Sequence, residues 1–332
     1  MKSVICFGEA LIDFLNINRV EEQPLSLNEF RQYPGGAPAN VAVAIAKLGG
    51  KALFAGQVGK DAFGDFLQHA LASYQVDTQL MSRHPQAKTP LAFVMLDEYG
   101  ERSFSFFRDQ TADLLFETSQ IKENWFNDTT ILHFCSNTLT EDAIASTTQF
   151  AVSLAKKKNA LISFDVNLRH NLWRDEIVNI ARVNNLAKQA DILKYSKDEL
   201  VFLAQGNEQA YIDNLLVAGV SLILVTDGAG KINYYGINDV GEIIPPMVKA
   251  VDTTAGGDAF IGAFLFGLSQ ADDTSMLLTQ PTLYRSLITF ASACGAHAVT
   301  QPGAFTALPT FSDVAIDWNS NETFKEVHHA IL

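Results

Sequence analysis

Short, continuously apolar runs alternate with longer segments of helical periodicity along most of the chain. Six runs have this character, at residues 4–7, 52–55, 131–134, 161–165, 191–193 and 221–226. A strand with one face in water alternates apolar and polar residues, whereas a strand covered on both faces is apolar throughout. The runs therefore predict an α/β fold with a mostly parallel central sheet between helical layers.

Helices are predicted between these strands, where apolar residues recur at helical spacing. The ranges are 38–48, 61–73, 141–157, 258–268 and 283–299. Pro38 suits a first helical turn, and Gly49-Gly50 is a good stop for the same helix. No internal repeat or low-complexity linker divides the chain.

Two segments interrupt the strand-helix alternation. Residues 13–33 are polar and irregular, and residues 90–107 read as a hairpin of two alternating strands around Glu98-Tyr99-Gly100. We expect these segments to form a small β-sheet lid on a main domain made of residues 1–12, 34–89 and 108–332. Its apolar faces would cover a ligand or a second subunit, and a purely structural role is the alternative.

Composition excludes several classes of protein. The 332 residues are 48% hydrophobic and 18% charged, which is too apolar for a disordered chain. The formal charge of −13 argues against a nucleic-acid or anionic-membrane partner. Three scattered cysteines are typical of reduced core residues, and the longest apolar stretch, 259–268, is too short to span a bilayer. We expect a soluble, cytoplasmic protein.

The most informative segment is a glycine-containing turn that leads into an apolar helix, Asp252-Thr253-Thr254-Ala255-Gly256-Gly257-Asp258. Small residues let another group approach the backbone, and the unpaired amides of a helix start can bind a phosphate. Asp258 could then accept a proton from an attacking hydroxyl. Ordinary capping of a tight turn by Thr253, Thr254 and Asp258 explains the same residues, so both interpretations stay open here.

A second glycine pair also precedes a helix. Gly35-Gly36 permits close approach of a polar ligand, and Asn40 supplies a donor and an acceptor on the first turn. Alone this is a weak signal, because two glycines before a helix are often only a turn.

Together these segments resemble the ribokinase-like (PfkB) carbohydrate kinase family, with both of its signatures in the usual order. The resemblance extends from Gly8 to Pro309 and implies a three-layer α/β/α sandwich with a small β-sheet lid. Within the family the chain is most similar to fructokinases, through segments 35–42, 100–108, 165–173 and 294–296. Aminoimidazole riboside kinases and 2-keto-3-deoxygluconate kinases look similar over the same segments.

The resemblance implies transfer of the γ-phosphate of MgATP to the 6-hydroxyl of D-fructose. Asp258 would be the general base, although an ordinary aspartate pKa near 4 would limit it mainly to orienting the hydroxyl. The backbone of Ala255, Gly256 and Gly257 would stabilise the transferring group. Sugar-binding residues implied in the same way are Asp13, Gly35, Gly36, Asn40, Arg108, Asn167 and Arg169.

The resemblance also implies a nucleotide site. Its residues would be Lys194, Glu199, Thr226, Gly228, Gly230 and Ser292. Glu199 would hold Mg²⁺ through water, which suits an ion that keeps its hydration shell. Asp252 would belong to a loop for a monovalent cation, K⁺. A homodimer in which each lid packs on the other is expected.

Two departures from the family pattern bear on activity. Ala255 stands where the family usually has glycine, which would cost about 1–2 kcal/mol if that position needs positive φ. Ser292 stands where many members have asparagine beside the adenine. A catalytically silent sugar-binding relative is therefore the rival hypothesis. Other nucleotide and hydrolase motifs are absent: Gly49-Gly50-Lys51 is no Walker-A loop, and neither G-x-G-x-x-G after the first strand nor G-x-S-x-G occurs.

Overall fold

The six apolar runs form six adjacent parallel strands of one sheet. The structure is a computed structural model that describes residues 2–96, 102–127, 129–271 and 274–314. Its main sheet has nine strands in the order β13-β12-β11-β10-β9-β8-β1-β4-β5. The pairs from β11 to β5 are parallel, and only β12 and β13 are added antiparallel. The strands are β1 (Ser3–Phe7), β4 (Lys51–Gly59), β5 (Met81–His84), β8 (Thr129–Cys135), β9 (Leu161–Asp165), β10 (Ile192–Ser196), β11 (Leu222–Thr226), β12 (Ile232–Gly236) and β13 (Val240–Ile243).

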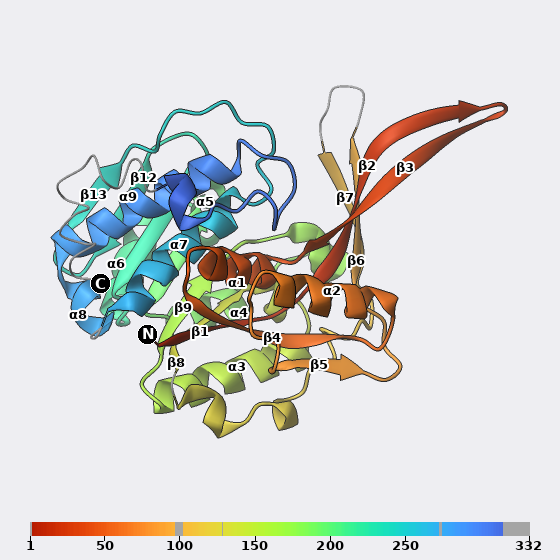
Figure 1. The fold of residues 1–332 in the computed structure, drawn as a ribbon. Coiled ribbons are helices and arrows are strands. Elements are labelled where there is room, and N and C mark those ends of the chain that lie inside the picture. The colour runs from red at the N-terminus through yellow and green to blue at the C-terminus, as the bar shows by residue number, and fades with distance from the viewer. Residues whose placement is uncertain (1, 97–101, 128, 272–273, 315–332) are drawn as a thin grey trace.

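Each face of this sheet packs into its own apolar core. In β1, Val4 and Cys6 belong to one core, whereas Ile5 and Phe7 belong to the other. Both sets are apolar because neither face meets water, which confirms the three-layer α/β/α prediction. The first core receives α1 (Ala37–Lys47), α2 (Ala62–Ser73), α7 (Gly256–Gln270), α8 (Thr274–Thr279) and α9 (Pro281–Ala298), and the second receives α3 (Asp142–Lys157), α4 (Ile180–Ala187), α5 (Lys197–Ala204) and α6 (Glu208–Val217) (Figure 1).

The five predicted helices correspond to α1, α2, α3, α7 and α9. The sequence analysis did not predict α4, α5, α6 and α8, which are short. Few of their side chains are buried: α5 buries Leu200 and Leu203, and α6 buries Ile212 and Leu215. Short 3₁₀ turns complete the loops: η1 (Thr118–Gln120), η2 (Glu123–Phe126), η3 (Ser136–Leu139), η4 (His170–Leu172) and η5 (Arg174–Glu176). Among the described residues, no helix is both long and apolar enough to cross a bilayer.

A second, four-stranded sheet stands off the main domain. Its order is β3-β2-β6-β7, with β2 (Leu11–Glu22), β3 (Leu25–Gly35), β6 (Leu91–Leu96) and β7 (Arg102–Phe107). Figure 1 shows the β2–β3 hairpin reaching well beyond the rest of the molecule. Residues 13–33 thus form a regular hairpin in spite of their irregular sequence pattern, and the predicted small sheet is confirmed. Much of the hairpin is exposed on both faces, so its sequence lacks apolar alternation. The expected turn at 98–100 lies outside the described residues.

Candidate active site

Helix α7 begins with backbone amides that its N-cap side chain does not satisfy. Ala255 is the N-cap residue, and the Gly256 amide donates only a long bond of 3.4 Å to the Thr253 carbonyl. These N–H groups have no intrahelical partner, and they lie at the positive end of the helix dipole. The Ala255 φ is −99°, so alanine is unstrained there and the conditional penalty for replacing glycine does not arise. A Cβ on Gly256 would lie 2.7 Å from Cγ1 of Val299, which explains glycine at that position.

Asp258 lies in the first turn of α7, where its side chain is buried. Its Oδ2 accepts a hydrogen bond of 2.7 Å from Nδ2 of Asn40 in the first turns of α1. Burial raises the pKa of Asp258 to about 7, and the Asn40 hydrogen bond only partly opposes this. Asp258 is therefore a stronger base than the ordinary aspartate assumed from the sequence. Its pKa lies close to neutral pH, which suits proton transfer there.

Gly35 and Gly36, which precede α1, leave space for the Asp13 carboxylate and for the backbone of Glu9. A Cβ on Gly35 would overlap Oδ2 of Asp13, so only glycine leaves space for that carboxylate. Gly36 has φ of +102°, and a Cβ there would lie 2.5 Å from the carbonyl oxygen of Glu9. Burial raises the pKa of Asp13 to about 7, with Arg169 opposing the shift. The structure thus gives a steric reason for both glycines.

A small cavity joins the lid to the turn before α7. Its lining residues are Asp13, Leu15, Tyr33, Val94, Asp252, Thr254, Gly303 and Ala304. Asp252 closes the turn through its two carboxylate oxygens, which accept hydrogen bonds of 2.9 Å from the amides of Thr254 and Gly303. The predicted sugar-binding and cation-binding aspartates therefore line one cavity.

Two further predicted residues follow β9. Asn167 has φ of +38°, an uncommon backbone conformation that asparagine tolerates better than most residues. Arg169 is exposed. Its positive charge partly opposes the rise that burial causes in the pKa values of Asp13, Asp165 and Asp258. Its guanidinium is thus a cation that acts on the carboxyl groups of the site.

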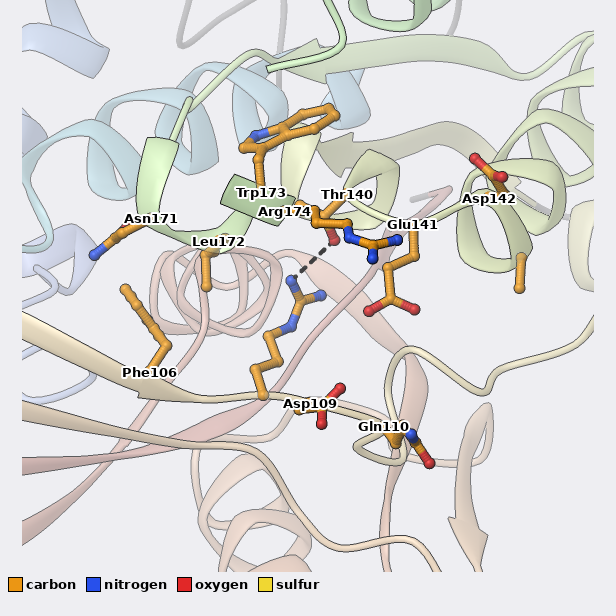
Figure 2. A pocket seen from close by; sticks show the side chains of 12 residues that line it. Phe106, Asp109, Gln110, Thr140, Glu141, Asp142, Asn171, Leu172, Trp173 and Arg174 are labelled. Atoms are coloured by element: carbon orange, nitrogen blue, oxygen red, sulfur yellow. Dashed lines mark hydrogen bonds between the residues drawn. The ribbon is translucent and has the colours of Figure 1, made fainter. Parts of the chain in front are cut away.

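Arg108 lies in a buried cluster of hydrogen bonds. Its Nε donates to Asp113 Oδ2 at 2.6 Å and its Nη2 to the Asn137 carbonyl at 2.9 Å, and the pair is buried. A third bond reaches Thr140 (Figure 2). The guanidinium is engaged by protein groups, which favours a structural role over the predicted sugar contact.

Beside Arg108 lies a pocket of about 780 Å³, bounded by the end of β7, the start of α3 and the loop after β9 (Figure 2). The residues of the small cavity near α7 do not line it.

The predicted nucleotide residues are spread over β10, α5, β11 with the turn that follows it, and α9. Gly228 has φ of +54°, and the Gly230 amide donates to the Asp227 carbonyl at 2.7 Å, so a tight turn follows Thr226. Ser292 is buried, and its hydroxyl donates to the Thr289 carbonyl of its own helix at 2.7 Å. The hydroxyl proton is used there, so Ser292 could meet the nucleotide only as a hydrogen-bond acceptor.

Glu199 caps helix α5 and ties it to the neighbouring loop. Its Oε2 accepts from the Ser196 amide and its Oε1 from the Leu168 amide, both at 2.7 Å. The Ser196 hydroxyl accepts from the Glu199 amide in return, which completes a capping box. The carboxylate is therefore rigidly held. It keeps further lone pairs for a hydrated Mg²⁺, so the donor set fits an ion that retains its water.

Comparison with known proteins identifies the family of the chain. The family model described as pfkB family carbohydrate kinase matches residues 1–311. The chain belongs to this family. It is 39% identical over 315 residues to probable fructokinase-5 of Arabidopsis thaliana, covering 93% of this chain and 95% of the relative.

Solved structures of the family are equally similar. The Xylella fastidiosa fructokinase with bound ATP has a TM-score of 0.89 at 42% identity, covering 96% of this chain and 99% of that one. A double mutant of the Vibrio cholerae O395 fructokinase, in a form with fructose, ADP and potassium ion bound, has a TM-score of 0.84 at 36% identity. That alignment covers 95% of this chain and 98% of the other.

Two buried residues of this PfkB kinase, Glu9 and Asp165, were not found from the sequence. Glu9 Oε1 accepts from the Ala37 amide at 3.2 Å and from Asn137 Nδ2 at 2.8 Å, so it links α1 to η3. Asp165 pairs with Lys194 through both of its oxygens. Their positions in the sequence could have indicated them, because Glu9 follows the first predicted strand and Asp165 ends the strand at 161–165. Ligand sites in open α/β sheets form at such carboxyl ends.

Proposed function

We propose that this PfkB kinase transfers the γ-phosphoryl group of ATP to the 6-hydroxyl of D-fructose. The observation that carries the proposal is the buried Asp258 at the uncapped start of α7, which places a base of raised pKa beside an anion-binding turn. Similarity to fructokinases supports the choice of sugar, and the solved relatives with ATP and with fructose and ADP support both substrates.

The chemistry follows from this arrangement. Asp258 takes the proton of the sugar hydroxyl, whose oxygen forms a bond to the γ-phosphorus. The bond between that phosphorus and the oxygen shared with the β-phosphate breaks in line, and ADP leaves with the electron pair. The backbone N–H groups of residues 255–257 donate to the phosphoryl oxygens as charge develops on them. Asn40 fixes the Asp258 carboxylate for this step.

The remaining site residues bind and orient. Asp13 and Asn40 would hold sugar hydroxyls above Gly35-Gly36, with Asn167 and Arg169 at the opposite wall. Thr226, Gly228, Gly230 and Lys194 would lie along the nucleotide. Mg²⁺, held through water by Glu199, would neutralise phosphate charge when bound, and a K⁺ would bind beside the Asp252 turn.

The small sheet, residues 13–33 and 90–107, would act as the lid of this site. Leu25, Leu27 and Phe107 on it are 60%, 41% and 61% exposed, which is unusual for large apolar side chains. Covering them favours a homodimer in which the lids pack together. We place the enzyme in the cytoplasm, where fructose and ATP would both be available.

The test is ADP release with MgATP against fructose, ribose, 2-keto-3-deoxygluconate and aminoimidazole riboside. Asp258→Asn should lower kcat with fructose by at least about 1000-fold. Asp191→Asn is the matched control, because Asp191 binds the Ile162 amide at the opposite end of the sheet strands. Turnover of another panel member only would keep the kinase and reject fructose. Sugar binding without any turnover would indicate the silent sugar-binding relative.

A further inference from the structure

The most closely held cation near the proposed reaction centre is the ammonium of Lys194. Lys194 lies in β10 directly opposite Asp165, which ends the neighbouring parallel strand β9. Its Nζ donates to the two Asp165 oxygens at 3.0 and 2.9 Å. The Lys194 and Asp165 side chains are 8% and 2% exposed. The ammonium therefore cannot move away with its stem, as a surface lysine would.

This ammonium lies against the anion-binding turn. A Cβ built on Gly257 would lie 3.0 Å from Lys194 Nζ, and Nζ is the nearest atom that such a Cβ would meet. Glycine at 257 thus leaves the charged group beside the first turn of α7. An ammonium has three N–H donors, and the two bonds to Asp165 leave one more. The ammonium thus has a third N–H donor beside the turn whose amides would bind the phosphoryl oxygens.

The charge balance of the site calls for such a cation. Asp13, Asp165 and Asp258 are all carboxyl groups of one region, and they influence one another or share Arg169 as a neighbouring charge. A phosphoryl group that approaches ionised Asp258 meets a like charge, which a buried site screens poorly. A fixed positive charge next to Gly257 offsets that repulsion at the place where negative charge develops.

We propose that the Lys194 ammonium is a catalytic group that stabilises the phosphoryl group during transfer, and that Asp165 is the positioning residue that holds it beneath Gly257. The inference rests on the proposed kinase function and refines it. Lys194 then serves the transferring group and not the nucleotide base or ribose. The alternative is a buried ion pair that only joins β9 to β10.

A double-mutant cycle separates these roles. Lys194→Gln alone leaves Asp165 buried without its partner, so loss of folding would be uninformative by itself. Lys194→Gln with Asp165→Asn replaces the ion pair by a neutral pair that can still form a hydrogen bond. We expect the double variant to regain the wild-type melting temperature while kcat with fructose stays about 100- to 1000-fold down. The KM for fructose should change by less than about threefold, because neither Lys194 nor Asp165 is among the proposed sugar contacts.

A binding measurement provides the second readout. MgADP with fluoroaluminate, a mimic of the transferring phosphoryl group, should bind the wild type at least about 100-fold more tightly than MgADP alone. The double variant should lose most of that difference and keep its affinity for MgADP. Lys156→Met removes a positive charge from the far side of α3 and should change neither quantity.

Recovery of both stability and kcat in the double variant would overturn the proposal and leave a structural ion pair. A change confined to the KM for ATP would also overturn it, since the ammonium would then bind the ground state. If the wild type itself fails to phosphorylate fructose, the proposed function fails. The fluoroaluminate comparison still tests Lys194 in that case.

Discussion

At the scale of single residues, the site combines two carboxyl groups whose protons are held more tightly than usual. The pKa values of Asp13 and Asp258 are both raised to about 7, in each case mainly by burial. A protonated carboxyl can still accept a hydrogen bond, but only the ionised form can take the proton of a sugar hydroxyl. In the proposed mechanism, acceptance of that proton therefore depends on pH near neutrality.

This gives a first prediction for the pH profile. Because Asp258 must be deprotonated to act as base, kcat/KM for fructose should fall as pH drops below about 7. The slope should approach tenfold per pH unit and become steeper if Asp13 must also be ionised, since two protons must then be lost. Steady-state kinetics between pH 5 and 9 measures this. A profile that stays flat down to pH 5 would contradict the raised pKa values.

The same shift predicts a change in stability. The folded chain holds the Asp258 proton more tightly than the unfolded chain, so ionisation destabilises the fold as pH rises from about 4 to 7. Asp258→Asn removes this titration. The variant should therefore be more stable than the wild type at pH 8, on the order of 2 kcal/mol, and nearly equal to it at pH 4. Urea unfolding at both pH values decides, and equal stabilities at pH 8 would refute the burial argument.

At the scale of elements, the start of α5 has two separable functions. Ser196 and Glu199 cap the helix together, but only Glu199 also reaches the Leu168 amide and has a charge to offer a hydrated ion. Loss of the cap would lower the stability of the fold, whereas loss of the ion would lower the rate of phosphoryl transfer.

The two residues therefore form a matched pair for a third prediction. Ser196→Ala should cost about 1 kcal/mol of stability and leave the Mg²⁺ dependence of kcat unchanged. Glu199→Gln keeps one acceptor but removes the charge, so it should raise the Mg²⁺ concentration for half-maximal rate at least about fivefold. Rates titrated with Mg²⁺ at fixed ATP measure both. An equal response of the two variants would assign Glu199 to capping alone.

Elements were predictable where one local signal dominated. The six apolar runs became the six adjacent parallel strands, because burial on both faces leaves few alternatives for a short apolar segment. Helix α1 was correct because Pro38 and Gly49-Gly50 mark its ends. The β2–β3 hairpin was assigned to the small sheet, but its exposed strands carry no apolar alternation, so their bounds and register could not be predicted.

Side-chain pairs were harder to predict than elements. The Lys194–Asp165 pair depends on strand order, which no single segment encodes. The Arg108–Asp113 pair is local in sequence, but it depends on the conformation of the loop after β7, which has no regular pattern.

At the scale of the whole molecule, the small sheet exposes apolar side chains that a monomer would leave in water. Ile17, Leu25 and Leu27 lie on the β2–β3 hairpin and are 46%, 60% and 41% exposed. We expect sedimentation to show a dimer at micromolar concentration, and Leu25→Lys with Leu27→Lys to give monomers. Val217→Lys is the control, because Val217 is 88% exposed on α6 in the main domain. A monomeric wild type would refute packing through the lids.

Strand direction has a further consequence for the whole molecule. The six adjacent parallel strands all point their carboxyl ends toward the site. The turns that lead into β4, β9, β10 and β11 therefore lie at the opposite end of the strands, at residues 49–50, 158–160, 188–191 and 219–221. Figure 1 shows the N-terminus apart from the small sheet. Coupling to an electrode or bead through a cysteine substituted into one of those turns would orient every copy of the enzyme with its active site toward the solution.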